Sequence, residues 1–263
     1  MRAEDVLRQL TTPIGAPAYP AGGPYRFTDR EYLNITYRTD PEAMRAIVPE
    51  PLTVGDPLVT FEVMKMPDVS GLGAFTESGL VLTVEHQGEQ AAYLHSMYVD
   101  NLGSIVSGRE IGAFPKKFGS AKLHLDVDTL VGTLDYRTIR VATATMGYKH
   151  ARLDESEALA QITRPTYALK LLPGYDRKPR ICELVTSQIT DITIKGAWTG
   201  PARLQLFDHV MAPLSDLPVL EIVSANHILC DLTLGRYSLV HDYLNPDGPS
   251  PDGPSPDQSG DRA

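Results

Sequence analysis

The sequence predicts a single, mainly β domain of the α+β class, in which a twisted, largely antiparallel sheet curls into a barrel with few short helices. Three observations support this fold class. Strand-like apolar runs follow one another with short interruptions, and few segments carry helical signals. The chain has 263 residues, a length that barrels and sandwiches reach as one unit.

The first expected elements are an N-terminal amphipathic stretch, residues 1–10, and a helix at Pro41–Val48. Asp40 is a suitable N-cap for this helix, Pro41 fits its first turn, and Pro49 ends it. The N-terminal stretch carries acids in its first turn and lacks the apolar core of a signal peptide.

The clearest strand is Leu58–Met64, which alternates so that Val59, Phe61 and Val63 share one face. Glu62 projects from the opposite, mostly apolar face, as a carboxylate in a pocket would. A solvent-facing strand acid is the common alternative.

Further strands and a second helix complete the expected fold. The strands are Gly79–Glu85, Tyr93–Val99, Lys122–Val127, Thr129–Tyr136, Thr138–Thr145, Thr166–Leu172, Ile181–Ile194 and Val219–Leu234. The last two are long enough to require bends. The helix is Glu155–Ile162, which begins at Asp154 with Glu157 in the spacing of a capping box.

Composition restricts the partners and the compartment. The net charge of −9 argues against nucleic acid or an anionic membrane as partner, and no run approaches membrane-spanning length. Cys182 and Cys230 lie in apolar runs without metal-type spacing, so we expect reduced core residues in a cytoplasmic protein; a disulfide is the alternative.

The composition changes after Leu244. Residues 245–263 repeat Pro, Asp, Gly and Ser with almost no apolar side chain, so they cannot bury a core. We therefore expect a single catalytic domain at 1–244 and a disordered tail at 245–263.

The stretch Gly108–Gly119 is the most informative for chemistry, because Lys116 and Lys117 stand among apolar neighbours. A free lysine amine has a pKa of about 10.4 and is protonated at neutral pH. Burial lowers a lysine pKa by up to about 3–5 units and exposes a nucleophilic lone pair. If the run is a strand, the two lysines point to opposite faces, so desolvation matters more than their mutual repulsion. The alternative is a solvated loop.

Other catalytic motifs are missing from the sequence. The 7 histidines form no close metal-binding pair, and no Gly-x-Ser-x-Gly nucleophile elbow accompanies them. The glycines form no phosphate-cradling loop. We therefore expect no metal, nucleotide or other cofactor.

Ordered blocks from about Val6 to Leu244 resemble the acetoacetate decarboxylase family. These blocks are Pro24–Tyr32, Ser70–Gly73, Thr76–Gly79, Gly108–Gly119, Asp128–Tyr136, Ala142–His150 and Trp198–Pro201. The resemblance implies a coned β-barrel, a large homo-oligomer and a small-molecule β-keto acid substrate. It also implies decarboxylation of acetoacetate to acetone and carbon dioxide through a Schiff base, with no cofactor.

The resemblance assigns roles residue by residue. Lys116 would form the Schiff base, with Lys117 as its cationic neighbour. The polar pocket residues would be Arg30, Glu62 and Glu77. The substrate-binding apolar wall would be formed by Phe27, Met97 and Phe114, although family members often carry Tyr at the position of Phe114.

The sequence permits alternatives for the role of Arg30 and for the function of the whole chain. Arg30 either steers the substrate acid, partly neutralised by Glu62 or Glu77, or forms an ion pair that stabilises the fold. The same scaffold could instead support a Schiff-base aldolase-dehydratase or cyclase acting on pyruvate-like oxoacids. A non-catalytic barrel in which Lys116 stays charged and pairs with an acidic ligand is the third alternative.

Overall fold

The computed structural model describes residues 1–20 and 23–246, and it confirms the mainly β prediction. The larger sheet contains β1 (Tyr25–Arg38), β2 (Leu58–Val69), β3 (Gly73–His86), β4 (Glu89–Val99), β5 (Lys116–Phe118), β9 (Ala151–Arg152), β10 (Thr166–Pro173), β11 (Pro179–Thr199) and β13 (Glu221–Asp242). A smaller sheet contains β6 (Ser120–Asp126), β7 (Thr129–Tyr136), β8 (Ile139–Gly147) and β12 (Ala202–Leu206). The helical segments are α1 (Ala3–Val6), α2 (Pro41–Arg45), α3 (Leu102–Glu110), α4 (Glu155–Thr163) and the 3₁₀ turn η1 (Leu214–Asp216). The expected tail, 245–263, lies almost entirely outside the described residues.

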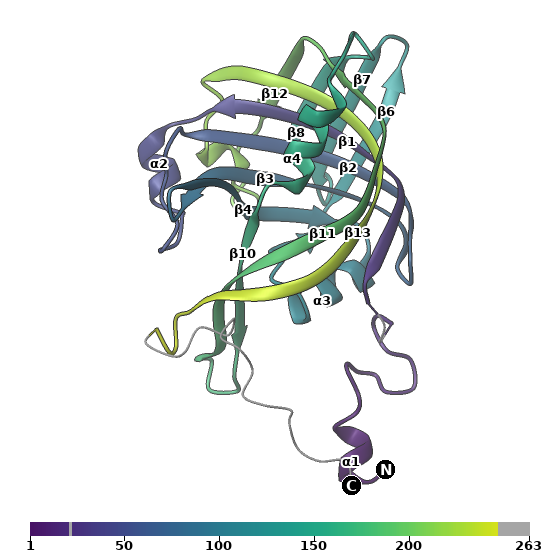
Figure 1. Ribbon diagram of the computed structural model, residues 1–263, viewed down its shortest axis with the longest axis vertical. Helices are drawn as coiled ribbons and strands as arrows, with labels where there is room; N and C mark the ends of the chain where they lie inside the picture. The colour runs from purple at the N-terminus through teal and green to yellow at the C-terminus, as the bar shows by residue number, and fades with distance from the viewer. Residues whose placement is uncertain (21–22, 247–263) are drawn as a thin grey trace, which may run out of the picture.

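The larger sheet closes on itself as a ring. Its strands follow the order β10-β11-β13-β1-β2-β3-β4, and β4 then pairs with β10. This closing contact is short and parallel, with Thr166 opposite Ala92 and Tyr167 opposite Tyr93. Figure 1 shows the long, curved β11 and β13 sweeping across the molecule, while α1 projects away from the sheets.

The main core lies between the ring and the smaller sheet. The alternation predicted for β2 is confirmed, because Val59, Phe61 and Val63 belong to this core while Glu62 faces the inside of the ring. On β7, a Cβ at Gly132 would lie 2.9 Å from Val63 Cγ2, so only glycine lets the two sheets approach this closely. This core lies outside the ring, and the ring interior contains a separate cavity.

Several elements differ from the sequence prediction. α2 ends at Arg45 rather than Val48, because a residue before proline disfavours the helical conformation and the last turn opens early. Asp154 caps α4 by accepting from the Ser156 backbone N–H rather than through the expected box with Glu157. β1, β9, β12 and α3 were not predicted.

Two of these omissions have physical causes. β1 contains a bulge in which Asp29 has φ 55°, and its register shifts between Phe27 and Arg30, so strict alternation is lost. α3 contains Gly103 and Gly108, which weaken the helical signal. The bends expected in the two longest strands are confirmed by register shifts along β11 against β13.

Candidate active site

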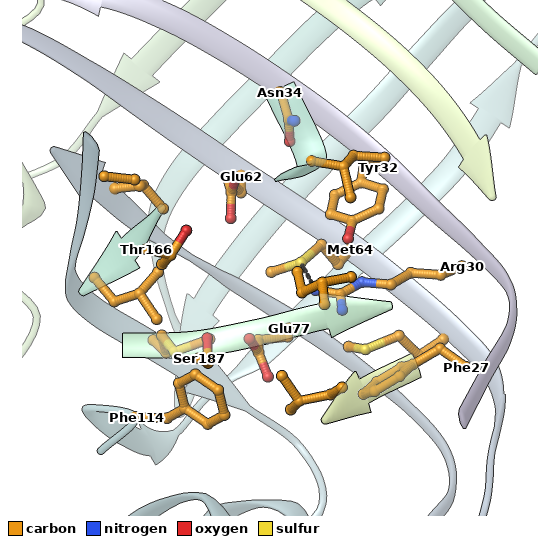
Figure 2. A pocket seen from close by; sticks show the side chains of 18 of the residues that line it. Phe27, Arg30, Tyr32, Asn34, Glu62, Met64, Glu77, Phe114, Thr166 and Ser187 are labelled. Carbon is orange, nitrogen blue, oxygen red and sulfur yellow. Dashed lines mark hydrogen bonds between the residues drawn. The ribbon is translucent and has the colours of Figure 1, made fainter. Parts of the chain in front are cut away.

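A cavity of ≈ 120 Å³ lies inside the ring. Its apolar walls include Phe27, Met64, Met66, Phe75, Met97 and Phe114. Its charged lining residues are Arg30, Glu62, Glu77, Lys116 and Arg164. Figure 2 shows charged and apolar side chains converging on one space from several strands. The cavity is smaller than the about 300–1,000 Å³ of sites for drug-sized ligands, so it suits a small molecule.

Lys116 is buried at the start of β5, and only 8% of the residue is exposed. Its Nζ lies 3.0 Å from Glu77 Oε2 and donates to Ser104 Oγ at 2.9 Å. The rings of Phe114 and Phe75 lie beside this ammonium, with centroids at 5.3 and 5.8 Å from Nζ. The lysine is therefore held in a buried, mostly apolar environment with one carboxylate partner.

The structure does not bring Lys117 to the cavity. Strand alternation turns it to the opposite face, where Nζ donates to the Met211 carbonyl at 2.6 Å and lies 5.3 Å from the Tyr136 ring centroid. This placement does not fit the role of cationic neighbour within the cavity. The cations that share the cavity with Lys116 are instead Arg30 and Arg164.

α3 positions Lys116. The Asn101 side chain caps this helix by accepting from the Ser104 N–H at 2.8 Å. Arg109 Nη1, near the other end, donates to the Lys116 carbonyl at 3.3 Å. A Cβ at Gly108 would lie 2.8 Å from Lys116 Cδ, so the glycine makes room for the lysine side chain. The helix therefore fixes both the backbone and the side chain of Lys116.

The two glutamates have different surroundings. Glu77 is 2% exposed and is paired with Lys116. Glu62 has no hydrogen-bond or ion-pair partner among the described residues. Burial raises the pKa of Glu62 to about 7, and Arg30 and Arg164 offset part of this effect. Glu62 can therefore hold or release a proton near neutral pH.

Arg30 enters the cavity after the bulge in β1. Its Nη2 donates to Met64 Sδ at 2.8 Å, and its guanidinium lies 4.6 Å from the Tyr32 ring centroid and 4.9 Å from that of Phe27. Its Nε is buried without a hydrogen-bond partner, and Arg30 forms no ion pair with any described residue. This arrangement leaves a positive charge available for an acidic ligand.

Sequence reasoning missed several residues of the site. Ser104 was missed together with α3, although Asn101 is a recognisable N-cap. Arg164 follows α4 directly, where Pro165 ends the helix, and burial lowers the pKa of this guanidinium. Asn34 and Gln161 also line the cavity, and nothing in their local sequence indicated that.

The described part of the chain contains neither a candidate metal site nor a helix that could span a membrane. Residues 1–20 and 23–246 contain no group of three or more His, Cys, Asp or Glu side chains able to hold a metal ion. No helix of these residues has the length and hydrophobicity needed to cross a membrane. Cys182 and Cys230 are both free thiols. Cys230 is buried, as expected for a core residue, whereas Cys182 is only partly buried and does not belong to the core.

Fold and cavity together define a class of protein: a ring-shaped β protein that presents a buried lysine–glutamate pair and a free arginine to a small ligand. The model of the acetoacetate decarboxylase family matches residues 10–244. The chain belongs to this family, and the resemblance seen in the sequence is confirmed.

Individual relatives agree with the family match. The acetoacetate decarboxylase of Streptomyces nogalater is 66% identical over 244 residues, covering 93% of this chain and 100% of the relative. A solved structure of an acetoacetate decarboxylase is 58% identical with a TM-score of 0.91, covering 93% of this chain and 100% of that chain. The Legionella pneumophila acetoacetate decarboxylase structure is 43% identical with a TM-score of 0.87, covering 93% of this chain and 97% of that chain.

Proposed function

We propose that the protein decarboxylates acetoacetate to acetone and carbon dioxide through a Schiff base on Lys116. The family supports the reaction class, and the cavity supports the role of Lys116. The observation that carries the proposal is the placement of this amine, 8% exposed and 3.0 Å from Glu77 Oε2, inside a small cavity that has apolar walls and a few charged groups.

The first step requires a neutral amine. In the resting pair, Glu77 Oε2 lies close enough to Lys116 Nζ to accept its proton directly. The amine then adds to the substrate ketone, and loss of water gives a protonated imine.

The second step breaks the bond between the α-carbon and the carboxylate. The protonated imine accepts the released electron pair and becomes an enamine, while carbon dioxide leaves. Arg30 attracts the substrate acid into the cavity, but a tight clamp would stabilise a charge that disappears in the transition state. The nearby acids limit that effect by making a buried carboxylate less stable.

The last steps protonate the enamine at carbon and hydrolyse the resulting imine. Glu62 is suited to give this proton, because its pKa of about 7 keeps a large protonated fraction near neutral pH. Hydrolysis releases acetone and restores the Lys116 amine. No cofactor is required, since the imine itself is the electron sink.

The test combines product analysis with covalent trapping. Wild-type protein incubated with acetoacetate is expected to release carbon dioxide and acetone, and borohydride is expected to stop turnover and leave an adduct on Lys116. Lys116→Ala should show neither turnover nor adduct. Trapping without carbon dioxide would favour aldolase-type chemistry on oxoacids, and neither signal would favour a binding protein.

We also propose a cytoplasmic homo-oligomer. Two free cysteines suit a reducing compartment. The exposed apolar side chains of the projecting N-terminal segment, including Val6, Leu7 and Leu10, suit contact with another copy. Light scattering of the purified chain tests the assembly, and a monomeric mass would contradict it.

A further inference from the structure

A second cavity of ≈ 160 Å³ lies inside the ring, next to the first. We call it the polar cavity, and its lining includes Thr36, Thr60, Thr83, Gln90, Ser224 and Asn226. Four residues line both cavities: Asn34, Glu62, Gln161 and Arg164. The two spaces therefore meet at a shared polar boundary.

The strand register explains the change in polarity. Along β1 and β2, successive inward-facing pairs are Tyr32 with Met64, Asn34 with Glu62, and Thr36 with Thr60. The hydroxyls of the last pair lie 3.0 Å apart. Figure 2 shows Asn34 and Glu62 at the end of the reaction cavity away from Phe114. The side chains that line the interior thus change along these strands, from apolar groups, past the Glu62 carboxyl group, to hydroxyls and amides.

The boundary contains buried polar atoms that lack protein partners. Asn34, 9% exposed, has a buried Oδ1 with no hydrogen-bond partner among the described residues, and the same holds for Arg164 Nε. Leaving such groups unsatisfied destabilises the folded protein. Water satisfies groups of this kind where the space is polar and large enough. At the outer end, Gln90 and Ser224 are exposed, so the polar cavity reaches solvent.

The proposed reaction needs a proton in each turnover and a water molecule in its last step. Conversion of the acetoacetate anion to acetone and carbon dioxide takes up one proton per turnover, which ends on carbon. Hydrolysis of the product imine also takes up one water molecule, which replaces the one released when the substrate imine formed. Met64, Met66 and Phe75 line the reaction cavity with apolar side chains. Its hydroxyl-bearing residues, Tyr32, Thr166 and Ser187, and the Ser104 hydroxyl that accepts from Lys116 Nζ do not line the polar cavity, whose boundary with the reaction cavity is formed by Glu62 and its polar neighbours.

We infer that the polar cavity is the inlet through which protons and water reach the reaction site, with Glu62 as the group that passes the proton inward. This inference rests on the proposed function. The protonated Glu62 gives its proton to the enamine carbon, the carbon–carbon π pair forms the new C–H bond, and the nitrogen lone pair forms the iminium. Water in the inlet then returns a proton to the Glu62 carboxylate.

The test makes the inlet apolar without touching Glu62. Thr60→Val/Thr83→Val removes two hydroxyls from the polar cavity, and Thr133→Val is the control. All three threonines are 6% exposed, and Thr133 lines neither cavity. Two quantities are measured: the time courses of carbon dioxide and acetone in the first turnovers, and the rate at which acetone takes up deuterium from heavy water through its enamine.

The double variant is expected to release one equivalent of carbon dioxide per site rapidly, and then to turn over about tenfold more slowly, with acetone formed only at the slow rate. Deuterium uptake should fall by about the same factor. Loss of structure alone would slow the first carbon dioxide release too. Equal slowing of both products, or rates within about twofold of the control, would overturn the inlet. A wild-type protein that releases no carbon dioxide would instead contradict the proposed function, and deuterium uptake would still decide the inlet.

Discussion

Lys116 Nζ and Glu77 Oε2 lie 3.0 Å apart, and 9% and 3% of their respective side chains are exposed. Two such groups out of water depend on each other, because either charge alone would be buried without compensation. The same pair is the proposed donor and acceptor of the first proton transfer. Its contributions to stability and to chemistry can be separated by substitution.

Lys116→Ala should abolish turnover and also destabilise the fold. It leaves the Glu77 carboxylate buried and unpaired, and removing one partner of a buried pair costs about 3–5 kcal/mol. Lys116→Ala/Glu77→Gln should recover a large part of this loss while staying inactive. Urea unfolding measures both variants, and a double variant no more stable than Lys116→Ala would contradict the coupling.

The pH dependence of turnover should reflect Glu62. Its protonated form is the proposed acid, and burial raises its pKa to about 7, so kcat is expected to fall as the pH rises through about 7. Glu62→Gln should have a much lower kcat that lacks this alkaline limb. A variant profile that keeps the wild-type limb would assign the titration to another group.

Glu62 should also affect stability, with a definite sign. The pKa of its carboxyl group is raised on folding, so the native state holds an extra proton between the unfolded and folded pKa values, from 4.5 to about 7. The contribution of Glu62 to stability therefore falls as the pH rises through this window. Relative to wild type, Glu62→Gln should gain on the order of 2–3 kcal/mol between about pH 4 and about pH 8. Denaturation at both pH values tests this, and a pH-independent difference would refute it.

Arg30→Met should weaken recognition of the acid more than it weakens the fold. Arg30 has no ion-pair partner among the described residues, so its charge is available to a ligand carboxylate. Losing a charge-assisted hydrogen bond costs about 1.5–3 kcal/mol, or roughly 10- to 100-fold in KM for acetoacetate. Inhibition by acetone, which has no carboxylate, serves as the control and should change little. A large drop in Tm with an unchanged KM would favour a structural role.

Gly108→Ala should separate stability from activity. Alanine favours a helix over glycine by up to about 1 kcal/mol, so the fold is expected to tolerate the change. The new Cβ would lie 2.8 Å from Lys116 Cδ and displace the amine, so borohydride trapping and kcat should fall by about tenfold or more. Gly147→Ala, where the nearest atoms are 3.6 Å from the new Cβ, is the matched control. Unchanged trapping by Gly108→Ala would show that the lysine does not depend on this space.

The sequence predicted the parts of the fold whose local pattern is regular. Alternation placed Glu62 and Val63 on opposite faces of β2, and helix signals located the start of α2 and of α4. β1 escaped because its bulge at Asp29 breaks the alternation. α3 escaped because Gly103 and Gly108 lower the helical signal, and Gly108 is required beside Lys116.

The sequence predicted only those site residues that the family resemblance assigned. Lys116, Glu62, Glu77 and Arg30 line one cavity, although they are far apart in the sequence. The direction of Lys117 depended on whether β5 forms, which three residues of sequence cannot decide alone. Asn34, Gln161 and Arg164 belong to the site through ring closure, and no local pattern encodes a contact of that kind.

The short parallel pairing of β4 with β10, the seam that closes the ring, determines when during folding the protein becomes able to bind its substrate. The two strands share only the pairs Thr166–Ala92 and Tyr167–Tyr93, and Arg164 stands just before that seam. Residues from β1 to β13 enclose the cavity only once this distant pairing has formed, and pairing across long loops is slow. The capacity to bind substrate should therefore appear last during refolding, after most secondary structure has formed. A nascent or partly folded chain should accordingly neither bind the substrate nor convert it.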